Sequence, residues 1–297
     1  MTGGSRELKD PAVGKAYRKA ALMGAIPAAY LVVFFALPIL YLLVASLKTP
    51  DPTEFIGGSW TLENYSNILS DEYYLGVIWR TLTSSLGIVA VALLIGYAAA
   101  YRMASLTPGK RAFFLLLFLF PLMVSNVVRA YGWMAILGRE GVVNTTIKSL
   151  GYSGPPLRIL FSLEAVVIGL MTILLPYMVI SVLNALNTID KRYREAAASL
   201  GASPWRAFIH VTLPLSAPGV LTGTLLVFLL TLSAYITVSL LGGPRFKLLV
   251  SLVYDAVQTF QWAKAGALSF ILLALALGVA AVLIATLRPA GGKAAKQ

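Results

Sequence analysis

Cysteine is absent from this chain of 297 residues, and histidine occurs once, as His210. Without thiols the chain forms no disulfide bond and no thiolate metal site. His210 has no second imidazole with which to share a metal, so we interpret it as a solvated loop or interface residue. A membrane-embedded enzyme needs a nucleophile with a base, or a set of metal ligands, and these residues assemble neither. The sequence therefore indicates a chain that is not itself an enzyme.

Charge is also scarce. Charged residues make up 12% of the chain, whereas a soluble domain carries roughly 25%. Hydrophobic residues make up 58%, and the mean hydropathy is +0.81. These values indicate a protein of the lipid bilayer. The nucleotide-binding pattern G-x-x-x-x-G-K-[ST] is missing too, so the chain does not hydrolyse ATP itself.

Six long apolar runs supply the spans that a bilayer protein needs. A helix crosses the hydrocarbon core with ~20 apolar residues. The first run is longer than the ~7–15-residue core of a signal peptide, so we interpret it as an uncleaved helix. The sequence predicts an all-α membrane protein with six transmembrane helices over residues 21–287, between tails at 1–20 and 288–297. The predicted spans are Leu22–Leu47, Gly76–Met103, Ala112–Leu137, Leu160–Leu186, Ser216–Leu241 and Ala265–Leu287.

Basic residues gather in alternate connections between these runs. If the N-terminus is inside, residues 1–20, 102–111, 187–213 and 288–297 hold 15 Lys and Arg against 4 acids. The outside connections hold 8 basic residues against 8 acids, counting Glu164 at the edge of a span. Because short cytoplasmic loops are rich in Lys and Arg, both termini are expected in the cytoplasm. Topology thus accounts for the net charge of +12, and no nucleic-acid partner is needed.

Acidic residues are missing from the middle of all six runs. The alternative function that we weigh is an ion-coupled secondary transporter of small amines or amino acids. Such a transporter needs titratable or coordinating groups near the bilayer midplane. Their absence disfavours this alternative.

The longest internal connection on the predicted cytoplasmic side, residues 187–214, contains the stretch EAAASLGASPWRAFIHVTLP. Glu195–Leu200 has good helix formers, and Gly201 suits the left-handed conformation that ends a helix. Ser203 followed by Pro204 is typical of a helix start, and the proline that closes the stretch is expected to stop this second short helix. The pattern predicts either a compact helix–glycine–helix element that docks a partner or an ordinary loop on the lipid headgroups.

The spacing within this stretch resembles the EAA signature of the membrane subunits of binding-protein-dependent ABC importers. The triplet EAA is followed four residues later by a glycine and then by VTLP, where the usual form has isoleucine in place of Val211. The resemblance implies the type I ABC importer permease fold, in which this segment is a coupling helix seated in a cytoplasmic ATPase. The residues that it assigns to coupling are Glu195, Ala196, Ala197, Gly201 and Pro204.

The resemblance also implies the surroundings of the chain. It implies a bacterial inner membrane protein that works with a dimer of ATP-binding subunits and a periplasmic substrate-binding protein. ATP and Mg²⁺ would be bound by the ATPase, so no cofactor is expected in this chain.

Two further segments resemble the spermidine/putrescine branch of the family. They are VVRAYGWMAILGREGVVN at Val127–Asn144 and LLGGPR at Leu240–Arg245; TLENYSNIL is a weaker feature. This branch implies a heterodimer with a second related permease and an amine cargo. Polyamine permeases often carry an acidic residue just before the LLGG stretch, but this chain has Ser233-Ala234-Tyr235 there. A dication crossing the bilayer would benefit from that missing counter-charge.

Arg129 is the only charge well inside an apolar run. It either serves function, by contacting a substrate carboxylate or a gate, or it snorkels to the interface or bonds loop carbonyls. Taken with the missing carboxylate, the first interpretation predicts a small amine-bearing solute that has another polar or anionic group.

The remaining pathway candidates are aromatic and hydroxyl side chains. The aromatic residues form either an interfacial belt or a lining whose ring faces contact a cationic cargo. The two hydroxyl residues, four apart, are expected on one helix face, bonded to cargo or to the backbone one turn earlier. The set comprises Tyr131, Trp133, Tyr177, Tyr235, Ser233 and Thr237.

Overall fold

The computed structural model describes residues 23–25, 27, 29–50 and 58–287 of the chain, and both predicted tails lie outside this part. The described residues form helices, turns and one isolated bridge between Lys48 and Trp60. The elements in chain order are η2 (Val32–Ala36), α2 (Leu37–Ser46), α3 (Glu63–Ser70), α4 (Glu72–Ala104), α5 (Pro108–Leu119), η3 (Phe120–Met123), α6 (Asn126–Leu137), α7 (Val142–Ser149), α8 (Leu163–Thr188), α9 (Lys191–Ser199), α10 (Pro204–Ala207), η4 (Phe208–Thr212), α11 (Leu213–Leu232), α12 (Tyr235–Gly242), α13 (Leu249–Gln258) and α14 (Trp262–Leu287).

Five helices are long and apolar enough to cross a membrane, and a bent pair makes up to six. The five are Met23–Ser46, Glu72–Ala104, Leu163–Thr188, Pro204–Leu232 and Trp262–Thr286. The bent pair joins Pro108–Met123 to Asn126–Ser149 at 96°. The predicted all-α membrane fold is confirmed, but not every run is a single straight helix.

The core of the bundle lies where α4, α8 and α11 pack together. Its fully buried side chains include Phe228, Ile88 and Leu170. Lipid tails are as apolar as these residues, so membrane helices gain most from close packing at small residues. Gly219 of α11 shows this: an added Cβ would lie 2.4 Å from the Ala185 Cβ and 2.6 Å from the Ser181 carbonyl oxygen of α8.

The third predicted span, Ala112–Leu137, is wrong as a single helix. The α-helix α5 passes into the 3-10 helix η3, and Pro121 lies in the first turn of η3. The chain is then extended at Val124 and Ser125, with ψ angles of 135° and 139°. Proline supplies no N–H for an α-helical bond, so the run breaks here. The chain resumes as α6 in a new direction.

The fifth predicted span, Ser216–Leu241, is also wrong as one helix. It ends at Leu232, and the chain turns at Ala234 with φ −80° and ψ 58°. The Tyr235 N–H donates to the Ser233 carbonyl over 2.9 Å, which is an inverse γ-turn. A purely apolar run carries no periodic signal that would have revealed this local turn.

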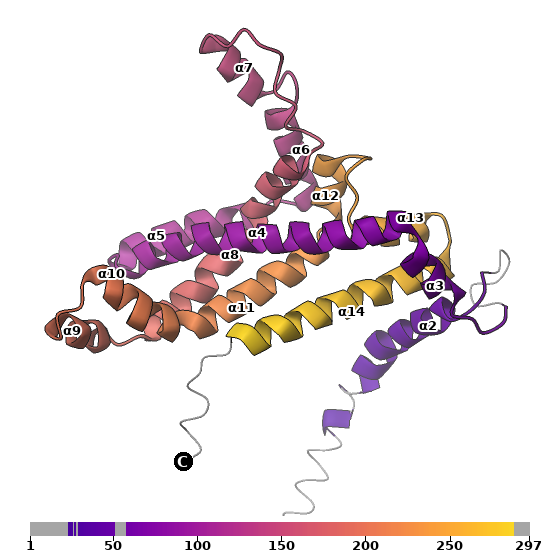
Figure 1. Cartoon of the computed structure of the whole chain (residues 1–297), viewed down its shortest axis with the longest axis horizontal. Coiled ribbons are helices and arrows are strands. Elements are labelled where there is room, and N and C mark those ends of the chain that lie inside the picture. The colour runs from indigo at the N-terminus through magenta and orange to yellow at the C-terminus, as the bar shows by residue number, and fades with distance from the viewer. Residues whose placement is uncertain (1–22, 26, 28, 51–57, 288–297) are drawn as a thin grey trace, which may run out of the picture.

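The two ends of the bundle differ (Figure 1). α9 and α10 lie at one end, beside the C-terminal end of α4, and α3 and α13 lie at the other end. The α6–α7 segment projects from the side of the bundle, with α12 next to α6. This arrangement separates the expected coupling segment from the broken helices.

Candidate coupling segment and translocation residues

α9 ends in a glycine turn. The Ala202 N–H donates to the Ala197 carbonyl over 3.0 Å, and the Gly201 N–H donates to the Ala198 carbonyl over 2.9 Å. This pair of bonds is the Schellman motif, which needs a left-handed residue after the helix. Gly201 supplies it with φ +80°, so the prediction that this glycine ends the helix in the left-handed conformation is confirmed.

The predicted start of the second helix is confirmed as well. The Arg206 N–H donates to the Ser203 hydroxyl over 3.4 Å, and Pro204 occupies the first turn of α10. At the other end of the segment, the side chain of Asp190 caps α9 by accepting from the Arg192 N–H over 2.9 Å. Side-chain caps of this kind satisfy N–H groups that the first helical turn leaves without partners.

The expectation that Pro214 stops this second helix is wrong. α10 continues through the π-helical turn η4 into α11, so Pro204–Leu232 is one span. A proline inside a helix loses one hydrogen bond and crowds the carbonyl four residues earlier. The wider π-turn, in which the Leu213 N–H donates to the Phe208 carbonyl, accommodates this. The segment is therefore one separate helix, a tight turn, and the projecting end of a transmembrane helix.

Large apolar side chains are exposed on this otherwise polar segment. Leu200 is 89% exposed, Trp205 68% and Tyr193 58%. Glu195 is exposed beside them. Apolar residues grouped on a polar surface mark places where a partner binds. We call residues 187–214 the docking element, because these exposed side chains make the segment the candidate contact for a partner.

An aromatic cluster ties this docking element to the bundle. The ring of Phe208 meets Tyr97 and Tyr101 of α4 edge to face, at centroid distances of 5.8 and 5.3 Å, and stacks on Trp205 at 5.5 Å. The Tyr97 hydroxyl also lies 2.9 Å from the Ser216 hydroxyl of α11. These contacts join α10 and η4 to α4, and the hydroxyl contact joins α4 to α11.

Arg111 holds the same end of the bundle together, and sequence reasoning missed it. Its guanidinium donates to the carbonyls of Met103, Ala104 and Leu106 at 3.2, 3.0 and 3.2 Å. It also donates to the Asn187 side chain over 3.0 Å. These bonds satisfy the C-terminal carbonyls of α4 and link them to the end of α8. The sequence shows Arg111 only as one of several basic residues in a loop. Nothing near it in the sequence indicates that Asn187, 76 residues away, is its partner.

Arg129 lies in the first turn of α6 and bonds across the break before it. Its guanidinium donates to the Pro121 carbonyl and to the Asn126 side chain, and at 3.4 Å to the Val124 carbonyl. Backbone groups freed at a break in the membrane need partners, and Arg129 supplies them. Of the two interpretations from the sequence, this geometry favours bonding to loop carbonyls.

The aromatic candidates lie on three different helices. Tyr131, on α6, is 57% exposed, whereas Trp133 on the same helix packs against the main core. Tyr177 belongs to α8 and is half-buried. Tyr235 begins α12 and stacks on Tyr254 of α13, with ring centroids 3.9 Å apart. The contact of α12 with α6 brings the two broken regions together, while Tyr235 finds a partner that the sequence did not suggest.

Ser233 and Thr237 do not share a helix, contrary to expectation. Ser233 is the cap residue that follows α11, and its hydroxyl donates to the Leu230 carbonyl over 3.0 Å. Thr237 lies beyond the Ala234 turn, on α12, where it is 5% exposed and its methyl group faces Gly169 of α8. The break at Ala234, which the four-residue spacing did not predict, places the two residues on different helices.

Residues 92–288 match the family described as "Binding-protein-dependent transport system inner membrane component". The chain belongs to this family. It is 35% identical over 229 residues to the spermidine/putrescine transport system permease protein PotB of Haemophilus influenzae, covering 77% of this chain and 80% of that protein. It is 33% identical over 250 residues to PotB of Escherichia coli K12, covering 84% of this chain and 90% of that protein.

The fold agrees with that membership. A chain in a crystal structure of a bacterial alginate ABC transporter, in complex with an alginate pentasaccharide-bound periplasmic protein, superposes with a TM-score of 0.76. The match covers 92% of this permease and 96% of that chain at 18% identity, so it shows the fold alone. The protein is an inner membrane permease with the ABC importer fold. This membership excludes the ion-coupled secondary transporter that was weighed as the alternative.

Proposed function

We propose that this permease forms the translocation pathway of a bacterial ABC importer for a polyamine-like or other amine-bearing small solute. The observation that carries the proposal is the identity of 33–35% to PotB permeases over most of the chain. The narrower expectation of a cargo with an added anionic group rested on Arg129 and on the missing carboxylate at Ser233-Ala234-Tyr235. Because that guanidinium is bonded to the backbone of its own break, it gives no reason to require an anion.

The energy for transport comes, in this proposal, from a dimer of ATP-binding subunits that binds ATP and Mg²⁺ and docks on residues 187–214. The exposed apolar residues of α9 and α10 and the missing nucleotide-binding pattern support it. A second, related permease completes the pathway as a heterodimer. A periplasmic binding protein delivers the cargo to the opposite end of the bundle.

The proposed orientation places both termini and α9 in the cytoplasm. It is supported by the 15 basic residues of the segments on that side against 8 on the other, since short cytoplasmic loops are rich in Lys and Arg. The pathway residues in this proposal are Arg129, Tyr131, Trp133, Tyr177, Ser233, Tyr235 and Thr237, with Arg129 acting as a structural support of the break.

The cargo is tested on the cognate periplasmic binding protein. We expect spermidine or putrescine to bind more tightly than neutral or acidic amino-acid derivatives in a calorimetric titration. Tight binding of a solute without an amine, with no response to either polyamine, would refute the cargo while leaving the transporter class intact.

A further inference from the structure

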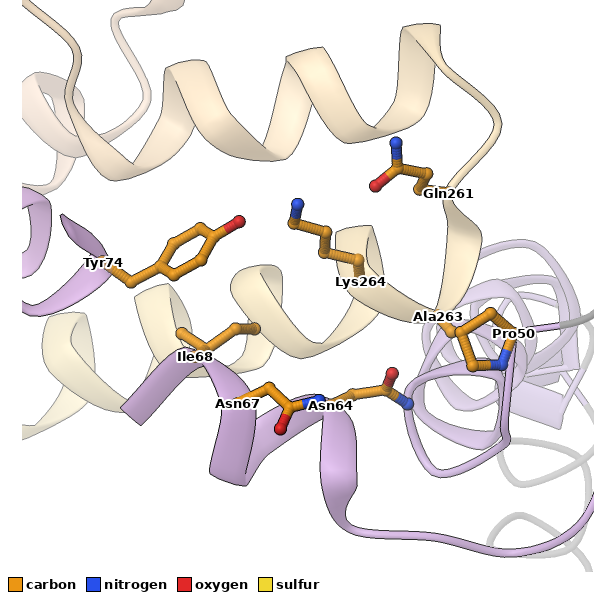
Figure 2. Close-up of a pocket in the computed structure, with 8 residues that line it drawn as sticks. All are labelled: Pro50, Asn64, Asn67, Ile68, Tyr74, Gln261, Ala263 and Lys264. Atoms are coloured by element: carbon orange, nitrogen blue, oxygen red, sulfur yellow. The ribbon is translucent and has the colours of Figure 1, made fainter. Parts of the chain in front are cut away.

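A pocket of about 390 Å³ is lined by residues of α3, α4 and α14 and the segments beside them (Figure 2). α3 and the start of α14 lie at the end of the bundle opposite α9 (Figure 1). Its walls come from α3, the first turns of α4 and the start of α14, with Asn64, Asn67, Ile68, Tyr74, Gln261 and Lys264 among the lining residues. No residue of the proposed coupling or pathway sets lines it. The pocket is therefore separate from both of these sets of residues.

The groups that line the pocket favour an anion. Lys264 is the only charged residue among the described residues that line the pocket, and these include no Asp or Glu. The Lys264 Nζ lies 5.3 Å from the centre of the Tyr74 ring, and Figure 2 shows the ammonium and the phenol hydroxyl pointing toward one another. A pocket with one positive charge repels a polyamine, so this is not a second site for the proposed cargo.

The hydrogen-bond donors of the pocket are largely uncommitted. The Asn64 side-chain amide already has partners within the chain, since it donates to the carbonyls of Ser46 and Lys48 at 2.9 and 2.8 Å. In the described part of the chain, by contrast, no hydrogen bond holds the side-chain amide of Asn67 or Gln261. The one ion pair found there joins Lys247 to Asp255, which leaves Lys264 without a carboxylate.

The pocket lies where two spans begin, at the expected level of the lipid headgroups. Glu72–Ala104 and Trp262–Thr286 both start beside it. Aromatic side chains surround that level: Tyr73 meets Tyr74 edge to face at 5.4 Å, and Phe260 meets Trp262 at 6.0 Å. Tyrosine and tryptophan gather at membrane–water interfaces. An anion in this pocket would sit at the bilayer surface.

We propose that this pocket binds a phosphate-type anion, with Lys264 as the counter-ion and the Tyr74 hydroxyl as a second donor. Ammonium and hydroxyl donors form strong, charge-assisted bonds with phosphate oxygens. Two sources share this chemistry: the headgroup phosphate of an anionic phospholipid, and free inorganic phosphate. An occupied pocket joins α3, α4 and α14 through one ligand and anchors this end of the bundle to the membrane surface.

The test uses the full chain, purified with the subunits that accompany it, and native mass spectrometry. The probes are short-chain phosphatidylglycerol, short-chain phosphatidylcholine and inorganic phosphate. We expect phosphatidylglycerol to bind more tightly than phosphatidylcholine. Lys264→Gln should weaken that binding roughly tenfold, as expected for the loss of one charge-assisted bond. Lys264→Arg should retain it, and Tyr74→Phe should weaken it by a smaller factor.

The matched control is Lys148→Gln, which removes the same charge from α7, away from the pocket. Unchanged phosphatidylglycerol binding in this variant supports a local site. Equal weakening by Lys148→Gln and Lys264→Gln, or no weakening by Lys264→Gln and Tyr74→Phe in proteins of unchanged melting temperature, overturns the proposal. Inorganic phosphate that binds alone and displaces phosphatidylglycerol identifies the free anion as the ligand, and lipid binding that resists phosphate identifies the headgroup.

A carboxylate of the chain itself is the remaining occupant to test. Asp51 and Glu54 follow Pro50, which lines the pocket, and lie outside the described residues. Unchanged lipid binding in Asp51→Asn/Glu54→Gln supports the proposal. A rise of more than tenfold in that variant would show that the chain fills its own pocket, and would contradict it.

Discussion

Gly201 is the residue on which the shape of the docking element depends. Its φ of +80° costs an L-residue with a Cβ roughly 1 kcal/mol or more. A Cβ added there would meet no atom within 4 Å, so backbone strain is the only penalty within this chain. We predict that Gly201→Val reduces the ATPase retained on purification about fivefold, since ~1 kcal/mol corresponds to that factor.

Two variants distinguish the effect of strain in the left-handed backbone from the effect of replacing a glycine. Gly201→Asn should retain most of the ATPase, because asparagine tolerates the left-handed region. Gly76→Ala, at a helical glycine with equally open surroundings, should have no effect on retention. Full retention of the ATPase by Gly201→Val would show that the turn does not set the docking geometry.

A second prediction for a single residue concerns Arg111. Arg111→Gln removes the donors for three backbone carbonyls and the Asn187 side chain. We expect the free energy of unfolding to fall by about 2 kcal/mol, the value of a hydrogen bond to a charged group that is not replaced. Thermal unfolding in detergent measures this, with Lys110→Gln as the neighbouring control. Equal melting temperatures for the two variants would contradict the assigned role.

Single residues were predictable from the sequence where the signal is local. Gly201 and Ser203 follow helix-capping rules that involve only a few consecutive residues, and the structure confirms both. Arg111 and Phe208 act through partners on other helices. Those contacts depend on how α4, α8 and α11 pack, and the spacing of residues in the sequence does not reveal this packing.

At the scale of elements, the continuous helix from Pro204 to Leu232 changes how motion would reach the core. The docking element is rigidly extended by a transmembrane helix, and Phe208 links it to α4 through Tyr97 and Tyr101. Aromatic pairs of this kind contribute about 0.5–1.5 kcal/mol beyond their buried area. The cluster is therefore strong enough to bias the position of α10.

We predict that Phe208→Leu uncouples the transporter. The exposed face of α9 is unchanged, so the ATPase should still co-purify, but the ratio of binding-protein-stimulated to basal ATPase activity should fall severalfold. Phe113→Leu, at a 64% exposed position on α5, serves as the control. An unchanged ratio in Phe208→Leu with a normal complement of ATPase would exclude the cluster as a coupling contact.

The helical type of the spans followed from hydropathy, but the breaks within them did not. Runs of apolar residues predict spans because each needs ~20 residues to cross the membrane. They do not show where a run turns, since the bend at Val124–Ser125 and the γ-turn at Ala234 are stabilised by local backbone geometry and by Arg129. In membrane proteins, non-helical backbone occurs where it is buried in protein or lines a cavity. The two breaks, on contacting helices α6 and α12, are thus better pathway candidates than any single aromatic residue.

At the scale of the whole molecule, the two ends of the bundle have separate tasks in this account. One end carries α9 and α10, the proposed contact for the ATPase, and the other carries α3 and α13 (Figure 1). The pocket that we propose binds an anion is lined in part by α3. Family membership establishes a permease of a binding-protein-dependent system. The coupling of ATP hydrolysis through residues 187–214 is the central claim that connects the fold to transport.

One measurement tests that claim most directly: uptake of radiolabelled spermidine by proteoliposomes that contain the complete complex and its binding protein. We predict uptake that requires ATP and the binding protein and that falls at least tenfold in Glu195→Lys, which reverses a charge on the exposed face of α9. Glu63→Lys, a charge reversal on exposed α3 at the opposite end, should transport normally. Normal ATP-driven uptake in Glu195→Lys, or uptake driven by an ion gradient without ATP, would contradict the account.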